Sequence, residues 1–389
     1  MTKNKELALY FHIPFCVRKC LYCDFLSAPG SSRVRRQYME ALTLEALIRA
    51  EECRGYLVTS VFFGGGTPSV VDSAQIRILL DVVRENFCIA QDAELTIEVN
   101  PGTVDEEKLA EYRAAGINRL SIGLQSANDA ELKALGRIHT WEQFLEAYRL
   151  ARQAGFKNIN VDVMSALPGQ SIESYLTTLQ KVIALDPAPE HISAYSLILE
   201  EGTHLYEMER RGEIRLPDED LDRLMYRKTK QVLHKECYHR YEISNYAREG
   251  FACRHNCGYW RRRNYMGFGI GAASLFNNMR FNNGEDMEFY LKDPLGCREE
   301  AQCLSRKEQM EEFMFLGLRL TEGVSFVEFE RCFGCDLDSI YGPVIAKSER
   351  EGLLKRYYRV MPSGVREEML ALTEFGLDVS NHVMAQFLL

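Results

Sequence analysis

The chain has 389 residues, of which 47 are basic and 56 acidic, giving a net charge of -9. This balance gives no electrostatic reason to expect a nucleic acid as partner. No apolar run reaches the roughly 20 residues needed to span a bilayer, and the first residues lead straight into a strand-like segment, so we expect a cytoplasmic protein. Its 12 cysteines are then expected to be reduced, and clustered ones to bind metal or do chemistry.

Short apolar runs in the first half of the chain are predicted to be strands. They begin at Leu7, Ser60, Leu95, Arg119, Asn158 and His191. Helix-like stretches lie between them, over residues 31–53, 73–87, 105–116, 140–155 and 171–186. This alternation favours a parallel sheet covered by helices, and it indicates an α/β fold with a partial (β/α)6 barrel. No G-x-G-x-x-G follows the first strand, which argues against a dinucleotide-binding fold.

The pattern changes after Gly202. We predict a helix over residues 218–237, a hairpin at "LFNNMRFNNG" with its Asn-rich turn, and helices from Ser305 onwards, including residues 367–389. The chain therefore divides into a barrel over 1–205, a small α+β extension over 206–300, and a helical C-terminal domain over 301–389. A winged helix is one form that this last domain can take.

Unusual polar residues fall at the carboxyl ends of the predicted strands. They are Gly64 to Thr67, Glu98, Gln125, Asp162 and Ser196. Sites in parallel α/β architectures are built at this end of the sheet, so we expect these residues to meet at one mouth.

Three cysteines, Cys16, Cys20 and Cys23, follow the first predicted strand with the spacing C-x3-C-x2-C. Three thiolates can bind three corners of a cubane iron–sulfur cluster and leave the fourth iron open to a ligand. Two alternatives are a structural zinc site with His12 as fourth ligand and three unrelated thiols.

The run "CVRKCLYC" resembles the cysteine signature of radical S-adenosylmethionine (SAM) proteins, with an aromatic residue, Tyr22, before the last cysteine. The run "GGGTPS" over residues 64–69 resembles the motif that contacts the methionine amino group in that superfamily. Together with "YFHIPFC", "IEVNPGT", "SIGLQS", "DVMSALPGQ" and "YEISNYA", the chain resembles the coproporphyrinogen dehydrogenase-related branch, the HemN and HemW proteins, over about residues 1–280.

The resemblance implies two cofactors. Cys16, Cys20 and Cys23 would ligate a [4Fe-4S] cluster. The residues that would hold SAM are Tyr10, Tyr22, Gly65, Gly66, Thr67, Glu98, Gln125, Arg137 and Asp162. One electron from the reduced cluster would then cleave a carbon–sulfur bond of SAM and leave a 5'-deoxyadenosyl radical.

The residue types suit the groups that SAM carries. Glu98 and Asp162 can accept hydrogen bonds from its ammonium and ribose hydroxyls, and Arg137 offers a bidentate fork to its carboxylate. Glycine at residues 64–66 lets the backbone approach closely. Any one of these polar residues alone could be a solvated strand-end residue, but together they predict one site.

Two departures separate this chain from the coproporphyrinogen dehydrogenases. Those enzymes carry a further cysteine two residues after the third, where this chain has Phe25, and a longer segment ahead of the cluster. In both features the chain resembles the HemW group. That resemblance implies a haem chaperone that delivers haem to respiratory haem proteins at the membrane. The alternative is an oxygen-independent coproporphyrinogen III dehydrogenase or another porphyrin-modifying radical SAM enzyme.

The run "RHNCGYW" resembles the H-N-x-x-Y-W signature of the HemW group. His255 is then the candidate for haem binding, and Tyr259 and Trp260 offer flat faces to a macrocycle. The other interpretation is a histidine and two aromatics that pack a domain junction. Relatives commonly show a histidine where this chain has Ala273.

The last predictions concern four more cysteines and the association of the chain with a membrane or with a second copy. Cys253 and Cys257 flank His255 and could bind haem or a metal, whereas Cys332 and Cys335 are interpreted as packed or incidental thiols. The resemblance also leaves room for peripheral membrane association and for a homodimer.

Overall fold

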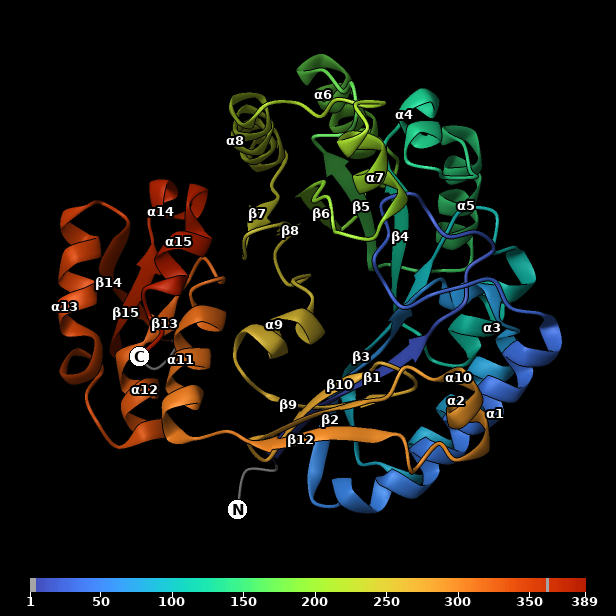
Figure 1. Cartoon of the computed structure of the whole chain (residues 1–389), viewed down its shortest axis with the longest axis horizontal. Coiled ribbons are helices and arrows are strands. Elements are labelled where there is room, and N and C mark those ends of the chain that lie inside the picture. The colour runs from blue at the N-terminus through green and yellow to red at the C-terminus, as the bar shows by residue number, and fades with distance from the viewer. Residues whose placement is uncertain (1–4, 362–363) are drawn as a thin grey trace.

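The computed structural model describes residues 5–361 and 364–389. Its main body is built on six parallel strands in the order in which they occur along the chain, as predicted (Figure 1). They are β1 (Lys5–Ile13), β2 (Tyr56–Gly65), β3 (Ile89–Val99), β4 (Arg119–Gln125), β5 (Ile159–Ser165) and β6 (His191–Ser196).

Helices connect these strands and cover the outer face of the sheet (Figure 1). They are α1 (Ser32–Arg49), α2 (Ser73–Asn86), α3 (Glu106–Ala114), α4 (Asp129–Ala134), α5 (Trp141–Gln153) and α6 (Ile172–Ile183), with 3-10 turns η1 (Ala50–Cys53) and η2 (Pro68–Val70). Each of the six α-helices starts after a Ser, Asp, Asn or Thr whose side chain accepts a backbone N–H of the first turn. Such caps fix where each helix begins.

The sheet continues beyond the barrel strands at both edges. The remaining elements before the C-terminal region are α7 (His204–Arg210), α8 (Glu219–Lys235), β7 (His239–Arg240), β8 (Asn245–Ala247), α9 (Arg254–Trp260), β9 (Asn264–Phe268), β10 (Ala273–Phe276), β11 (Met279–Asn283), α10 (Met287–Lys292) and β12 (Arg298–Cys303). β9 pairs in parallel with β1, and β8 pairs antiparallel to β6. The first and sixth parallel strands therefore do not pair with each other, and the barrel is partial.

The predicted hairpin is present. β10 and β11 pair antiparallel, and the two residues of the turn, Asn277 and Asn278, have φ angles of 51° and 62°. Asparagine tolerates this left-handed conformation better than most residues, which explains the turn. The predicted domain boundaries at residues 205 and 300 remain a proposal.

The C-terminal region has the element order of a winged helix. It consists of α11 (Arg306–Gly317), β13 (Val324–Ser325), α12 (Phe326–Phe333), α13 (Leu337–Arg350), β14 (Leu354–Val360), β15 (Arg366–Leu372), α14 (Glu374–Asp378) and α15 (Ser380–Ala385). Its sheet has the order β13-β15-β14. Our prediction of helix from residue 367 was wrong up to Leu372, because these residues pair with the aromatic strand β14.

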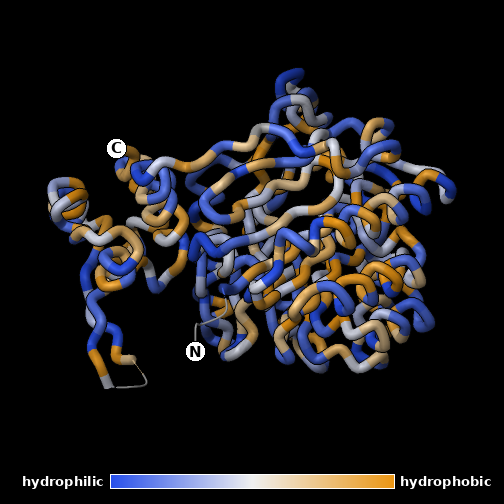
Figure 2. Tube along the Cα trace, turned by 90° about the horizontal axis from the view of Figure 1, so that it is seen from below, coloured by the Kyte–Doolittle hydropathy of each residue, from blue (hydrophilic) through white to orange (hydrophobic). Residues whose placement is uncertain are grey.

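Each of these two parts has its own large hydrophobic core, and a smaller cluster forms around Met164 and Leu205. The larger of the two cores runs through the barrel and into β9 and β11, where Phe11 stacks between Phe63 and Phe268 at ring-centre distances of 5.2 and 4.8 Å. The other large core lies within the C-terminal lobe, which stands beside the main body in Figure 2. Within the described residues, no helix is both long and apolar enough to cross a membrane.

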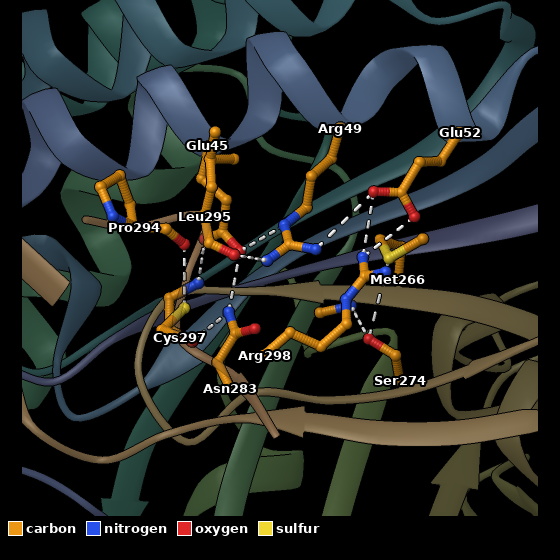
Figure 3. Close-up of polar contacts among 12 residues, drawn as sticks. Glu45, Arg49, Glu52, Met266, Ser274, Asn283, Pro294, Leu295, Cys297 and Arg298 are labelled. Carbon is orange, nitrogen blue, oxygen red and sulfur yellow. Dashed lines mark hydrogen bonds and ion pairs between the residues drawn. The ribbon is translucent and has the colours of Figure 1, made fainter. Parts of the chain in front are cut away.

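A buried polar network fastens α1 to the extension (Figure 3). The carboxylate of Glu45 accepts hydrogen bonds from Nε of Arg49 at 2.9 Å, Nδ2 of Asn283 at 2.8 Å, the backbone N–H of Gly269 at 2.9 Å and the hydroxyl of Tyr290 at 2.8 Å. The carboxylate is fully satisfied, as a buried charge requires.

A second layer of the same network reaches β12. Arg49 also donates to the carbonyl of Leu295 at 3.3 Å, and Glu52 pairs with Arg298 at 3.0 Å (Figure 3). The extension is therefore held to α1 by charge and hydrogen bonds as well as by the shared sheet.

Candidate cluster and SAM cavity

A cavity of about 430 Å³ lies at the carboxyl ends of the parallel strands. Most of the predicted site residues line it: Cys16, Cys20, Tyr22, Cys23, Gly65, Gly66, Thr67, Glu98, Gln125, Arg137, Asp162 and Ser196. They come from the loop after β1, from β2 to β6 or the residues directly after β2, and, for Arg137, from the loop after α4. The sequence prediction that these segments meet at one mouth is therefore confirmed.

The cysteine loop between β1 and α1 is anchored at its base and at its tip. At the base, the N–H of Cys16 donates to the carbonyl of Ala28 at 3.2 Å. At the tip, the N–H of Leu21 donates to the carbonyl of Leu135 at 3.0 Å, and Arg18 donates to the carbonyl of Gly136 at 2.7 Å. The loop thus presents three half-buried thiols to the cavity.

A structural zinc ion is the alternative to a cluster at the three thiols. Across residues 5–361 and 364–389, no three His, Cys, Asp or Glu side chains converge closely enough to hold one metal ion. The ring of His12 lies 3.0 Å from the Tyr10 hydroxyl through Nδ1 and 2.9 Å from the Leu26 carbonyl through Nε2, so it is not free to be a fourth ligand. In a cubane cluster each thiolate binds a different iron, and such convergence is not needed.

Glycine is required where the strand β2 meets the cysteine loop. Gly65 has a φ of +109°, and a Cβ there would lie 2.6 Å from the His12 ring. A Cβ on Gly66 would lie 2.7 Å from the carbonyl oxygen of Phe15. The N–H of Thr67 donates to that same carbonyl at 2.7 Å. Side chains are excluded here, so backbone lines this part of the cavity.

A chain of hydrogen bonds crosses the cavity wall from Thr67 to the cysteines. Nδ2 of Asn100 donates to Oγ1 of Thr67 at 2.7 Å, and Arg137 donates to Oδ1 of Asn100 at 2.7 Å. The other Arg137 nitrogen, Nη1, lies 3.7 Å from Sγ of Cys20. We did not predict Asn100, although its position directly after β3, in "IEVNPGT", was a signal for it.

Two half-buried carboxyl groups share the cavity. Burial raises the pKa of Glu98 from 4.5 to about 8, and the nearby Asp162 adds to the rise. Burial also raises the pKa of Asp162, although Asn160 donates to it at 2.8 Å. Gln125, with a φ of 66°, has its Oε1 buried without a hydrogen-bond partner among the described residues. Acceptors are therefore available to a cationic, hydroxyl-bearing ligand.

Tyr10 and His255 do not line this cavity. Tyr10 instead borders a second cavity of about 410 Å³, together with His12, Tyr259, Trp260, Tyr265, Gly271, Ala273, Leu275, Arg280 and Leu316. His255 is 1% exposed and lies behind Tyr259. Its motif forms the helix α9 (Arg254–Trp260).

The other cysteines discussed above lie outside the first cavity. Cys253 and Cys257 are buried in and before α9, and Sγ of Cys253 donates to Oε1 of Glu94 at 3.4 Å. Cys332 is exposed, and Cys335 packs against the C-terminal core.

Comparison with known proteins agrees with this geometry. The model of the radical SAM superfamily matches residues 10–182, and that of the HemN C-terminal domain matches residues 304–357. The chain is 36% identical to the heme chaperone HemW of Lactococcus lactis, over 99% of this chain and 98% of that one. It is 33% identical to the HemW of Bacillus subtilis, over 97% and 98% of the two chains.

The chain belongs to the HemN and HemW branch of the radical SAM superfamily. A solved structure of that branch, coproporphyrinogen III oxidase (HemN) from Escherichia coli, is similar with a TM-score of 0.83 at 24% identity. The match covers 99% of this chain and 90% of that one, so the HemN fold extends through the C-terminal lobe.

Radical SAM membership implies a [4Fe-4S] cluster and SAM, and the first cavity fits both. The three thiols lie on one wall of the cavity, and the Gly65–Gly66 backbone and the unpartnered oxygen of Gln125 lie on others. Phe25 is 60% exposed and lines the same cavity.

Proposed function

We propose that this protein is a haem chaperone of the HemW type that binds a [4Fe-4S] cluster, SAM and haem. It would pass haem to respiratory haem proteins, working in the cytoplasm and at the membrane surface. The observation that carries the proposal is Phe25, an apolar side chain at the cavity where coproporphyrinogen dehydrogenases carry a further cysteine. The full-length likeness to proteins named heme chaperone HemW supports it.

In this proposal Cys16, Cys20 and Cys23 hold the cluster, which together with SAM supplies one-electron chemistry when bound. Arg137 binds the SAM carboxylate, and its bonds to Asn100 and to the Gly123 carbonyl, both 2.7 Å, fix the direction of the guanidinium. A fork held in this way loses little conformational entropy on binding.

The carboxyl groups of Glu98 and Asp162 and the amide of Gln125 take the ammonium and ribose hydroxyls. The backbone of Gly65, Gly66 and Thr67 lies against the methionine part. Tyr22, which is half-buried beside Arg137, closes the cavity on the side of the cysteine loop. Every residue in this scheme has an acceptor, donor or backbone surface on the cavity wall.

Haem would bind at the second cavity, where Tyr259 and Trp260 of the α9 motif line the wall. Flat aromatic faces suit a macrocycle. Tyr10 and His12 belong to the same wall and to β1, the strand that leads into the cysteine loop. The haem and SAM sites would therefore be connected through β1 and the cysteine loop that follows it.

The test is an anaerobic assay of the reconstituted, reduced full chain with SAM, offered coproporphyrinogen III and haem in parallel. We expect stable haem binding and transfer to an apo-cytochrome, with no protoporphyrinogen. Conversion of coproporphyrinogen III with matching 5'-deoxyadenosine would overturn the proposal. The Phe25→Cys variant serves as a control for the part played by the missing thiol.

A further inference from the structure

The wall of the second cavity combines aromatic side chains with a single guanidinium. The aromatic rings are those of Tyr10, Tyr259, Trp260 and Tyr265. Among the described residues that line the cavity, Arg280 on β11 is the only Asp, Glu, Lys or Arg. Flat aromatic faces beside one guanidinium are complementary to a flat apolar ligand that carries an anionic group on its edge.

The guanidinium of Arg280 is held in place from two sides. Its Nε donates to Oε1 of Glu312 at 2.5 Å, and its Nη1 donates to the hydroxyl of Tyr265 at 3.2 Å. The side chain is still 35% exposed, and its Nη2 forms no hydrogen bond to the part of the chain that the structure describes. A guanidinium fixed in this way loses little conformational entropy when it binds a carboxylate.

The carboxylate of Glu312 does not cancel this charge, because two arginines share it. Glu312 on α11 is 7% exposed, and its second oxygen, Oε2, accepts from Nε of Arg262 at 2.8 Å. Within the described residues neither arginine has a second ion pair, and the other bond of Arg262 goes to the neutral amide of Asn278 at 2.9 Å. One positive charge is therefore left in excess beside the cavity.

Unpartnered N–H groups add to the positive potential of this region. Nη2 of Arg262 and Nε1 of Trp260 are buried, and neither has a hydrogen-bond partner among the described residues. The guanidinium of Arg319 lies over the Trp260 ring, 4.3 Å from its centre. An anion that binds to Arg280 would be stabilised by charges and dipoles that are already in place.

We propose that Arg280 binds a carboxylate on the edge of the flat ligand in the second cavity, and that it selects macrocycles with free carboxylates over uncharged ones. This inference rests on the haem binding of the proposed function, because haem carries its propionate side chains on one edge. Leu316 lines the cavity one turn after Glu312 on α11. The propionate edge would therefore lie where β11 meets the C-terminal lobe.

The test is a titration of the full chain with ferric haem and, in the same detergent buffer, with haem dimethyl ester, whose carboxylates are methylated. We expect the wild type to bind haem about tenfold or more tightly than the ester, the effect of one charge-assisted hydrogen bond. Arg280→Gln should bind haem about tenfold more weakly than the wild type and the ester equally well. Arg280→Lys, which keeps the charge, should keep part of the preference for haem.

Arg263→Gln is the matched control. Arg263 is an exposed arginine outside the cavity lining, and its ion pair with Glu6 is exposed as well. Removing its charge should leave the affinities for haem and for the ester at their wild-type values.

The two ligands separate a binding role of Arg280 from a structural one. Equal losses of affinity for haem and for the ester in Arg280→Gln would show that Arg280 only holds Tyr265 in place, and would overturn the inference. Equal affinities of the wild type for the two ligands would overturn it even if Arg280→Gln does not fold. Both results leave the proposed function standing, whereas absence of haem binding by the wild type would overturn the two together.

Discussion

Nε of Arg49 lies 2.9 Å from Oε1 of Glu45, in an ion pair whose two side chains are 5% and 0% exposed. The pair stands at the centre of the network that joins α1 to the extension (Figure 3). Through Gly269 it also fixes the loop that packs behind His12, where a Cβ on Gly269 would lie 2.7 Å from the His12 carbonyl. A buried pair of this kind orders a region that lies well beyond its own two residues.

Glu45→Ala should lower the free energy of unfolding by about 3 kcal/mol, because it removes the nearest counter-charge of the buried Arg49, whose other partner, Glu52, lies 3.7 Å away. Urea unfolding of the cofactor-free chain measures this. The control is Glu40→Ala on the same helix, whose pair with Arg36 is exposed at 69% and 67% and should contribute little. Equal losses in the two variants would contradict the structural role of the network.

Cys20→Ala should abolish the broad visible absorption of the reconstituted cluster, since each cubane corner needs its own thiolate. The exposed Cys332 lies far from the cavity in the C-terminal lobe, so Cys332→Ala should keep the full absorption and iron content. An unchanged spectrum in Cys20→Ala would remove the cluster assignment.

Glu98 should make both stability and SAM binding depend on pH. Because its pKa is about 8 in the folded protein and 4.5 ordinarily, the folded state keeps a proton that the unfolded chain releases between these values. The contribution of Glu98 to the free energy of unfolding is thus fully present below pH 4.5 and is lost as the pH rises through 8. Above about pH 8.5, the free energy of unfolding of Glu98→Gln should exceed that of the wild type by on the order of 4 kcal/mol, since one pKa unit is about 1.4 kcal/mol.

Cationic SAM favours the ionised carboxylate, so its binding should release the Glu98 proton. The affinity of the wild type is expected to fall as pH drops below 8, and the Gln variant should bind more weakly with a flatter pH profile. Calorimetry in two buffers of different ionisation heat counts the released proton. A Gln variant with the wild-type pH profile would show that another group titrates.

Asn100→Ala should weaken SAM binding about tenfold or more, because Arg137 and Thr67 both lose their shared partner. The exposed Asn86 at the end of α2 bonds only within its own helix, so Asn86→Ala is a matched control. SAM affinity, measured by equilibrium dialysis on the reconstituted protein, compares the two. Equal affinities would mean that Arg137 is held sufficiently by the Gly123 carbonyl.

The barrel was predictable because each of its strands is an apolar run bounded by helix caps. The short helices α4 and α9 were not, since six or seven residues give too little periodicity to identify a helix. β15 was missed because its pairing with β14 outweighs local helix preference.

The first cavity was predictable from one topological rule, that residues at the carboxyl ends of parallel strands meet. The resemblance to known proteins could not predict towards which cavity a side chain points. Tyr10 and His12 alternate with the core residues Phe11 and Ile13 along β1, and the structure places this pair on the second cavity. In the same way, only coordinates show that Tyr259 stands in front of His255.

β1 pairs with β2 on one side and with β9 on the other. Since β1 leaves the ribosome before β9, its pairing is completed only after Asn264–Phe268 has been made, and Gly269 and Gly271 close the rear of the cysteine loop just after it. The nascent chain carries its three cysteines through most of translation without that wall. Iron and sulfide delivered during synthesis would reach a cysteine loop that is still open at its rear. Iron and sulfide delivered to the finished chain would reach a loop that is already anchored.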